Sequence, residues 1–256
     1  MTVLLESKGI CKYFGGLKAV EKVDMQIKQG EIFGIIGPNG AGKTTFFNVC
    51  SGIYAPTAGE IWFNEENVTG MRPEEVAIRG MARTFQNIQL FKYMSVLENI
   101  KIGFHLHTKT NIFDAIMRNK RYKHDESLAK NVGLEILDQV GLTEYKDVQA
   151  ENLSYGMQRK VEIARAMALA PKILLLDEPA AGMNPQETIS LLKFMQNLNK
   201  QGYTIVVIEH DMKFMMNLCH RILVLNFGTV ICQGSCDDVK NDPAVIEAYI
   251  GKGFTL

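Results

Sequence analysis

The stretch Gly37-Pro38-Asn39-Gly40-Ala41-Gly42-Lys43-Thr44-Thr45 constrains the fold of this chain more than any other. Glycines at this spacing, followed by Lys and Thr, are typical of a phosphate-binding loop. The backbone N–H groups of such a loop converge on a small volume, which suits the many oxygens of a triphosphate. The glycines allow positive φ and a close approach of the backbone to those oxygens. Lys43 can place a positive charge on the β- and γ-phosphates, and the Thr44 hydroxyl can bind Mg²⁺.

The residues on either side of the loop support this interpretation. Ile32-Phe33-Gly34-Ile35-Ile36 is a short apolar run that predicts a buried strand. The apolar residues Phe46, Phe47 and Val49 follow the loop and predict a helix, whose N-terminus adds a positive dipole. The alternative is a glycine-rich turn before a helix. The order strand, loop, helix favours nucleotide phosphate binding over that alternative.

Composition excludes several classes of protein. At 256 residues, the chain can form one large α/β domain or two small ones. Its 28 basic and 28 acidic residues balance, so the charge does not indicate nucleic acid as the main partner. We find no signal peptide and no apolar run long enough to cross a bilayer. The scattered cysteines predict reduced thiols and no zinc site; they are Cys11, Cys50, Cys219, Cys232 and Cys236.

The first third of the chain predicts mainly strands. Residues 3–30 indicate an antiparallel region, because apolar and polar residues alternate from Val23 to Ile27. We expect the aromatic pair Tyr13 and Phe14 to lie in a loop within this region. Residues 59–64 predict a further strand, and residues 80–87 lead into a loop that carries Gln86.

The middle of the chain predicts helices. Ser95 and Glu98 form a capping-box pattern, so we expect a helix from there to about Gly103. Residues 105–124 are expected to be irregular, and a solvated basic face is favoured over contact with headgroups or a partner. Its basic residues are Lys109, Arg118, Lys120, Arg121 and Lys123.

A second helix is predicted from Asp125 to Val140. Its apolar residues Leu128, Val132 and Ile136 recur at helical spacing, and Gly141 would cap its end. We therefore expect residues 88–165 to form a helical subdomain inserted into an α/β core of residues 1–87 and 166–256, all within one domain.

The last third predicts a return to parallel strands. The apolar run 173–176 ends in Asp177 and Glu178, and the run 203–208 ends in Glu209 and His210. Polar residues at the carboxyl ends of such strands lie where open α/β sheets bind ligands. Residues 221–225 and 229–233 then predict a hairpin.

A further run, Leu153-Ser154-Tyr155-Gly156-Met157-Gln158-Arg159, gives a family resemblance. Together with the phosphate loop and Leu176-Asp177-Glu178-Pro179, it resembles the ATP-binding cassette ATPases over essentially the whole chain. Tyr155 stands for the usual first glycine of the signature, and Met157 for the usual glutamine. The resemblance implies a P-loop NTPase (RecA-like) core, an N-terminal antiparallel β subdomain, an inserted helical subdomain, and hydrolysis of ATP with Mg²⁺.

The residue chemistry suggests roles for each position. Ser154 and Gly156 open a helix, which makes a second anion site, although Ser154 alone fits an ordinary N-cap. Asp177 can hold hydrated Mg²⁺, and Glu178 can orient or deprotonate the attacking water. His210 would reach the γ-phosphate. A solvated loop is the alternative for the two carboxylates, and their pairing with a phosphate loop disfavours it.

Other roles come from the resemblance alone. It implies that Gln86 contacts Mg²⁺ and water and senses the transport partner, and that Phe14 stacks on adenine, with Tyr13 as the alternative. The expected catalytic residues are Glu178, His210 and Gln86, and the expected metal ligands are Thr44, Gln86 and Asp177. The expected nucleotide-binding residues are Phe14, Gly37, Asn39, Gly40, Gly42, Lys43, Thr44, Thr45, Ser154 and Gly156.

A narrower resemblance is to the LivG-type ATP-binding subunits of branched-chain amino-acid importers. It rests on residues 153–156, 161–166, 178–185 and 242–251, with Asn184 where most cassettes carry Asp. It implies transmembrane permease subunits, a second cassette subunit (identical or a LivF-like paralogue), an external substrate-binding protein, and a place on the cytoplasmic face of the membrane.

Two alternatives remain. One is a cassette of a lipid or lipopolysaccharide exporter. The other is a soluble cassette ATPase that acts on nucleic acid, ribosomes or iron–sulfur assembly. The chain has no coiled-coil insert, zinc module or second cassette, which favours transport and predicts no nucleic-acid partner.

Overall fold

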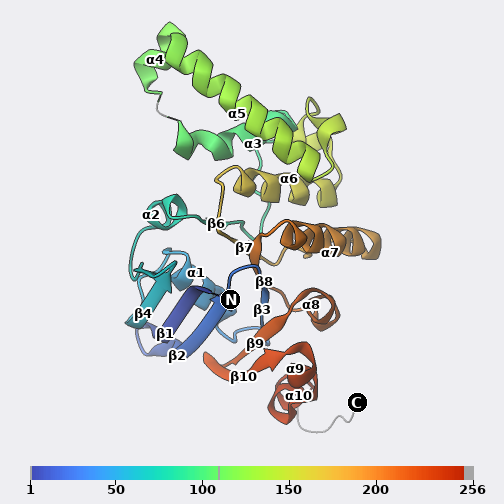
Figure 1. Ribbon diagram of the computed structural model, residues 1–256. Helices are drawn as coiled ribbons and strands as arrows, with labels where there is room; N and C mark the ends of the chain where they lie inside the picture. The colour runs from blue at the N-terminus through green and yellow to red at the C-terminus, as the bar shows by residue number, and fades with distance from the viewer. Residues whose placement is uncertain (1, 109, 251–256) are drawn as a thin grey trace.

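A computed structural model describes residues 2–108 and 110–250, with two β-sheets and a group of helices gathered at one end (Figure 1). The larger sheet has six strands in the order β10-β9-β3-β8-β7-β6. In that order, its strands are Thr229–Ser235, Arg221–Asn226, Ile32–Ile36, Thr204–Ile208, Ile173–Asp177 and Met81–Arg83. All neighbouring pairs are parallel except β9 and β10, which form the predicted hairpin.

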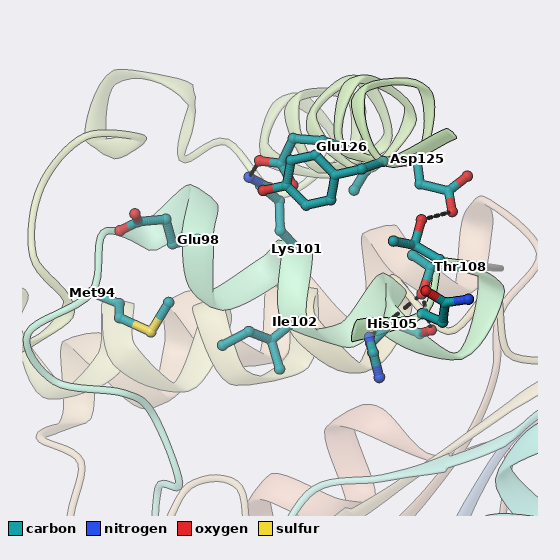
Figure 2. A pocket seen from close by; sticks show the side chains of 12 residues that line it. Met94, Glu98, Lys101, Ile102, His105, Thr108, Asp125 and Glu126 are labelled. Carbon is teal, nitrogen blue, oxygen red and sulfur yellow. Dashed lines mark hydrogen bonds and ion pairs between the residues drawn. The ribbon is translucent and has the colours of Figure 1, made fainter. Parts of the chain in front are cut away.

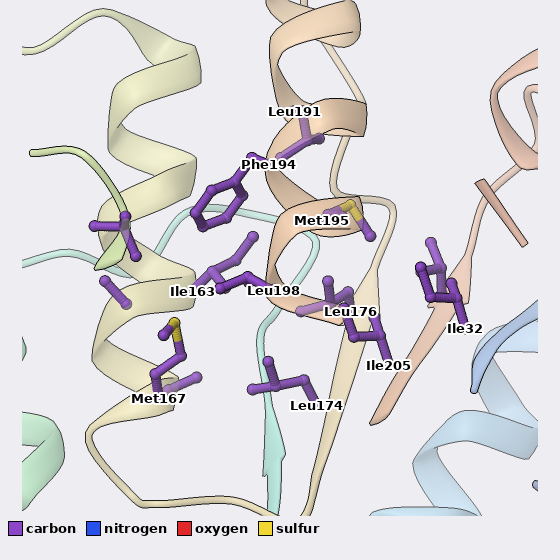
Figure 3. Packing of buried hydrophobic residues seen from close by; sticks show 14 of the residues in the cluster. Ile32, Ile163, Met167, Leu174, Leu176, Leu191, Phe194, Met195, Leu198 and Ile205 are labelled. Carbon is purple, nitrogen blue, oxygen red and sulfur yellow. The ribbon is translucent and has the colours of Figure 1, made fainter. Parts of the chain in front are cut away.

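The centre of this sheet is buried on both faces. Every residue of β3, β7 and β8 is buried, which confirms the prediction made from their continuous apolar runs. Side chains alternate between two apolar layers. Ile32, Leu174 and Ile205 lie in one apolar layer with residues of α6 (Tyr155–Met167) and α7 (Pro185–Lys200), such as Ile163 and Leu198 (Figure 3).

The other face of the sheet packs on α1 (Lys43–Cys50) and on the second sheet. Phe33 and Leu175 lie in this layer with Phe46 and Phe47 of α1. The second sheet has the order β2-β1-β4-β5 and pairs its strands antiparallel. In that order, its strands are Leu17–Lys28, Val3–Phe14, Ala58–Phe63 and Glu66–Asn67.

The antiparallel prediction is confirmed, with one correction. Buried and exposed residues alternate from Val23 to Ile27, as expected. The expectation that Tyr13 and Phe14 lie in a loop is wrong, because β1 continues to Phe14. These residues pair with Lys18 and Leu17 of β2 across the turn that follows, so the two strands stay hydrogen-bonded to their ends.

Helices form the end of the molecule farthest from the second sheet (Figure 1). The predicted capping box starts α3, since the Ser95 Oγ accepts from the Glu98 N–H and the Glu98 carboxylate accepts from the Ser95 N–H. These helices are α3 (Val96–Gly103), α4 (Ile112–Met117) and α5 (Lys120–Gln139), with 3₁₀ turns at Phe104–His107, Thr143–Tyr145 and Ala150–Asn152. The boundaries 88–165 for a separate subdomain stay a prediction.

Two expectations about residues 105–140 are wrong. Segment 105–124 is not irregular throughout, because Asn111 and Asp114 cap α4 reciprocally. Asn119 caps α5 by accepting from the Tyr122 N–H, so α5 starts at Lys120 and not at Asp125. Leu128 is 43% exposed, and the buried face consists of Ala129, Gly133, Ile136 and Leu137. Lys109 lies outside the described residues.

Four further helices complete the described part of the fold. They are α2 (Pro73–Ile78), α8 (Met212–Leu218), α9 (Cys236–Asn241) and α10 (Pro243–Ile250). Of these, α8 packs on the larger sheet through Phe214, Met215 and Leu218. Gly251, the last residue of the predicted C-terminal pattern, lies outside the described residues. Among residues 2–108 and 110–250, no helix has the length and apolar character that crossing a bilayer requires. All five cysteines are free thiols.

Candidate functional site

The phosphate loop joins the carboxyl end of β3 to the start of α1, as its sequence predicts. Gly37, Gly40 and Gly42 all have positive φ, of 155°, 79° and 94°. A Cβ on Gly37 would lie 2.1 Å from the Leu225 carbonyl oxygen, and one on Gly42 would lie 2.3 Å from that of Ala19. Side chains at these two positions would therefore collide with backbone, so the loop conformation depends on glycine.

Lys43 folds back over the loop that precedes it. Its Nζ donates to the carbonyl oxygens of Gly37 at 2.6 Å and Pro38 at 2.9 Å. Burial lowers the pKa of Lys43, and the nearby Glu178 carboxylate partly offsets this. The ammonium is thus held at the loop, where it can meet an incoming phosphate.

A cavity of about 480 Å³ lies against the loop. Residues 39–45 form its floor, and Glu178 lies at its edge. This floor of glycines, hydroxyl groups and one ammonium provides donors without bulky side chains. The residues present therefore fit a nucleotide phosphate group.

The sequence analysis did not predict the other residues that line this cavity. They are residues 17–19 from the start of β2 and residues 227–228 from the β9–β10 turn. The Gly228 N–H donates to the Ala41 carbonyl, and the Glu21 N–H donates to the Gly228 carbonyl. Nothing in the spacing of these residues reveals that three distant segments meet here.

Asp177 and Glu178 lie at the carboxyl end of β7, as predicted. Asp177 is 4% exposed, and its Oδ2 accepts from the Arg83 Nη2 at 2.8 Å. Glu178 has a φ of 43°, a left-handed conformation that is rare for residues other than glycine. A strained backbone of this kind persists only where the surrounding structure holds it, and such residues cluster at functional sites.

Arg83 is a site residue that the sequence analysis missed. It ends β6, donates to the Ser51 hydroxyl beyond α1, and places its guanidinium 4.9 Å from the centre of the Phe47 ring. The ion pair with Asp177 is nearly buried, since the two side chains are 9% and 5% exposed. A single arginine belongs to no sequence motif, so its role at the site becomes visible only because β6 packs beside β7.

Gln86 meets Glu178, although 92 residues separate them in the chain. Its Nε2 donates to the Glu178 Oε2 at 3.0 Å. The backbone of Gln86 is held by Arg159, the last residue of the run 153–159, and the sequence analysis did not predict this contact. Gln86 and Glu178, two of the three residues expected to be catalytic, are therefore in direct contact.

His210 lies at the end of β8 and does not line the cavity. Its Nδ1 is 3.6 Å from the Oε2 of Glu209, whose side chain is almost completely buried. Glu209 also accepts from the N–H groups of Ala180 and His210, and burial raises the pKa of its carboxyl. Glu209 therefore ties His210 to the loop after Glu178, a contact that the sequence analysis missed.

Phe14 is 43% exposed at the end of β1 and does not line the cavity around the loop. Its ring meets the ring of Tyr54 edge to face, with centres 5.4 Å apart. The Lys12 ammonium lies 5.1 Å from the centre of the same ring. Its accessible surface is compatible with the predicted stacking on a base, as is that of Tyr13, so the choice between them stays a prediction.

Ser154 and Gly156 open α6, away from the cavity at the phosphate loop. The Ser154 Oγ accepts from the Met157 N–H, which confirms the N-cap. The Gly156 N–H donates to the Glu187 Oε1 of α7, and Asn184 caps α7. The two helix starts that were expected to bind anions, at the phosphate loop and at Ser154, therefore lie in separate places.

The residues expected to bind Mg²⁺ fit this ion by their chemistry. Thr44, Gln86 and Asp177 all offer the oxygen ligands that Mg²⁺ prefers. Among the residues that the structure describes, no group of three or more His, Cys, Asp or Glu forms a metal cage. A Mg²⁺ ion here would instead share its ligands with substrate phosphates, which is its usual arrangement.

A second cavity, of about 600 Å³, lies in the helical end between α3 and α5 (Figure 2). Lys101 pairs with Glu126 across it, and the Thr110 hydroxyl donates to Asp125. None of the predicted site residues lines this cavity.

Comparison with known proteins gives consistent matches over most of the chain. A family model described as ABC transporter matches residues 20–181, and one described as branched-chain amino acid ATP-binding cassette transporter matches residues 229–255. The high-affinity branched-chain amino acid transport ATP-binding protein LivG of Salmonella typhimurium is 43% identical over 250 residues, which cover 97% of this chain and 98% of the relative.

Solved structures agree. The ADP conformation of MJ1267, an ATP-binding cassette of an ABC transporter, superposes with a TM-score of 0.86 at 33% identity, covering 98% of this chain and 100% of that chain. The dimeric structure of MJ0796, a bacterial ABC transporter cassette, gives a TM-score of 0.74 at 26% identity, covering 91% of this chain and 99% of that chain.

Proposed function

The chain belongs to the ATP-binding cassette family of transport ATPases, and from this premise we propose that it powers the import of branched-chain amino acids. It binds and hydrolyses ATP, as that family does. The observation that carries the proposal is the near full-length similarity to LivG, joined to a second match at residues 229–255. Export and non-transport roles have no comparable support.

We propose roles at the site from its geometry and, for His210 and Phe14, from the family resemblance. Lys43 and the backbone N–H groups of the loop hold the phosphates of ATP. Glu178 orients or deprotonates the attacking water, and Gln86 fixes the Glu178 carboxylate through the 3.0 Å contact between them. His210 meets the γ-phosphate, and Phe14 supports the adenine. Mg²⁺, when bound by Thr44, Gln86 and Asp177, supplies charge that stabilises the transferring phosphoryl group.

The proposal includes partners. Because Ser154 and Gly156 lie away from the phosphate loop of their own chain, they close over the nucleotide of a second cassette. The dimeric structure of MJ0796 supports such a pairing. Permease subunits would hold this dimer at the cytoplasmic face of the membrane and receive cargo from a substrate-binding protein.

The import assignment is tested in the source cell. The gene is replaced with a Glu178→Gln version, and uptake of labelled leucine, isoleucine and valine is measured against a Lys193→Ala control on the exposed face of α7. We expect uptake of at least one of the three to be lost in the Glu178→Gln strain alone. Normal uptake of all three, with the purified variant inactive as an ATPase, would overturn the cargo assignment.

The dimer is tested by crosslinking. Cysteines placed beside Ser154 and in the phosphate loop should crosslink between chains when ATP is added to a Glu178→Gln background. A mixture of Lys43→Ala and Ser154→Arg chains should regain closure at the one site built from intact parts. Crosslinks confined to single chains would contradict the shared site.

A further inference from the structure

Arg159 is a charged side chain that the proposed reaction does not use, and it is fully buried. It lies in α6, five residues after Ser154, and is 0% exposed. Its Nη1 contacts the Glu162 Oε2 at 2.7 Å, and Glu162 is 2% exposed. Burying such a pair costs several kcal/mol of desolvation per ion, and an apolar pair of similar volume is often as stable or more so. Stability alone therefore does not account for charge at this position.

The charge makes contacts that an apolar pair could not make. The Arg159 Nη1 donates to the Phe85 carbonyl at 2.8 Å, and its Nη2 donates to the Gln86 carbonyl at 2.7 Å. Two consecutive carbonyls are thus held by one planar guanidinium, whose geometry is rigid.

The neighbouring residues of α6 extend this contact. The Glu162 Oε1 accepts from the Gln89 N–H at 3.3 Å, and the Arg165 Nη1 donates to the Gln89 carbonyl. Arg159, Glu162 and Arg165 recur at three-residue spacing, so they lie along one face of α6. Segment 85–89 is therefore anchored to this helix by side chains at both ends.

The anchored segment carries Gln86, whose side chain reaches Glu178. The same helix begins at Ser154, and α6 is seated on α7 and the sheet by Ile163 and its neighbours (Figure 3). At 1.5 Å of rise per residue, Arg159 lies only about 7 Å along the axis from the helix start. One rigid element thus holds both Gln86 and the signature residues.

We propose that Arg159, supported by Glu162, is a positioning residue that fixes the backbone of Gln86 so that its side chain meets Glu178. The inference rests on the assignment of Gln86 and Glu178 to the ATPase site.

The test separates positioning from folding. Arg159→Met alone leaves the buried Glu162 carboxylate without its ion-pair partner, so it can fail to fold. The double variant Arg159→Met/Glu162→Leu removes both charges and should stay folded, with an unfolding midpoint close to that of the wild type. Arg221→Met/Glu31→Leu is the matched control, because it removes another ion pair, of 3.1 Å, away from Gln86.

Three readouts decide the proposal. The Arg159→Met/Glu162→Leu variant should lose about 10- to 100-fold in kcat for ATP, because small misplacements at a reacting centre cost this much, while its KM changes little. Amide exchange at Gln89 in the nucleotide-free protein should rise, and exchange in α1 should not. Gln86→Ala should lower kcat in the wild type and have little further effect in the double variant.

Different failures have different meanings. Normal kcat in the folded Arg159→Met/Glu162→Leu variant, with Gln86→Ala slow, would overturn the inference and leave the ATPase site intact. Multiplicative effects of the two sets of substitutions would overturn it equally. A Gln86→Ala variant with unchanged kcat would overturn the assignment of Gln86, and the inference with it.

Discussion

The phosphate loop and segment 85–89 both reach the same site, but different forces hold them. The loop is set by backbone: its glycines have positive φ, and Gly37 and Gly42 lie against the carbonyls of Leu225 and Ala19. Segment 85–89 is set by side chains of α6, above all by Arg159. The loop conformation comes from the backbone of its own glycines, which pack against carbonyls from other parts of the chain. Segment 85–89 depends instead on side chains more than 70 positions away.

This difference indicates how each region responds to change. A conformation dictated by the backbone of glycines does not depend on where distant side chains are placed. A conformation dictated by distant side chains can shift whenever the helix that carries them moves. We therefore expect the loop to bind nucleotide as a preformed site, and segment 85–89 to report the position of α6.

The largest expected effect is at the loop. Lys43→Ala removes the ammonium that the Gly37 and Pro38 carbonyls hold in place, so ATP hydrolysis should be abolished and ATP binding strongly weakened. Turnover by the purified variant and nucleotide binding by calorimetry check this, with Lys193→Ala as the control. Unchanged turnover would remove the phosphate-loop assignment altogether.

The next effect separates binding from chemistry at the point where the two regions meet. Glu178→Gln keeps the shape of the side chain but loses the base, so turnover should fall by roughly 10²–10⁴. Binding of MgATP should persist, because the loop is untouched. Single-turnover hydrolysis and equilibrium binding measure the two parts, and near-normal turnover would show that another group activates the water.

A smaller effect, on stability, is expected where Arg83 joins the regions. Arg83→Met leaves the Asp177 carboxylate buried without its partner, which costs about 3–5 kcal/mol. Urea unfolding of the nucleotide-free protein measures it. Adding Asp177→Asn should recover part of the loss, since the unpaired charge is then gone.

The control for this prediction is Arg79→Met. Arg79 pairs with Glu66 at the surface, where such pairs contribute about 0–1 kcal/mol. If Arg83→Met were no more destabilising than Arg79→Met, the link between β6 and Asp177 would not support the fold.

The smallest effect is expected at the adenine. Phe14→Ala should weaken ATP affinity by about 1–3 kcal/mol, the usual contribution of stacking on a base. Tyr13→Ala is the matched comparison, because it removes a neighbouring ring from the same strand. A larger loss in Tyr13→Ala than in Phe14→Ala would show that the other ring supports the base.

The sequence predicts the loop, the buried strands and the helix caps because each depends on residues close together in the chain. The run Ile32–Ile36, the capping box at Ser95 and the N-cap at Ser154 all form as expected. Two sequence predictions about residues 105–140 were wrong. Leu128 was expected on the buried face of α5 and is exposed. Residues 105–124 were expected to be irregular, but the caps at Asn111 and Asn119 start helices there.

Only the tertiary structure shows that Arg83 pairs with Asp177, that Arg159 holds Gln86, and that the β9–β10 turn lines the cavity. These contacts join segments with no fixed spacing, and a buried arginine looks like a surface arginine in a sequence. The partner of each buried arginine depends on which helices and strands pack together, because a buried charge must be paired. That requirement acts on the folded chain as a whole, whereas a glycine loop carries its requirement in its own backbone.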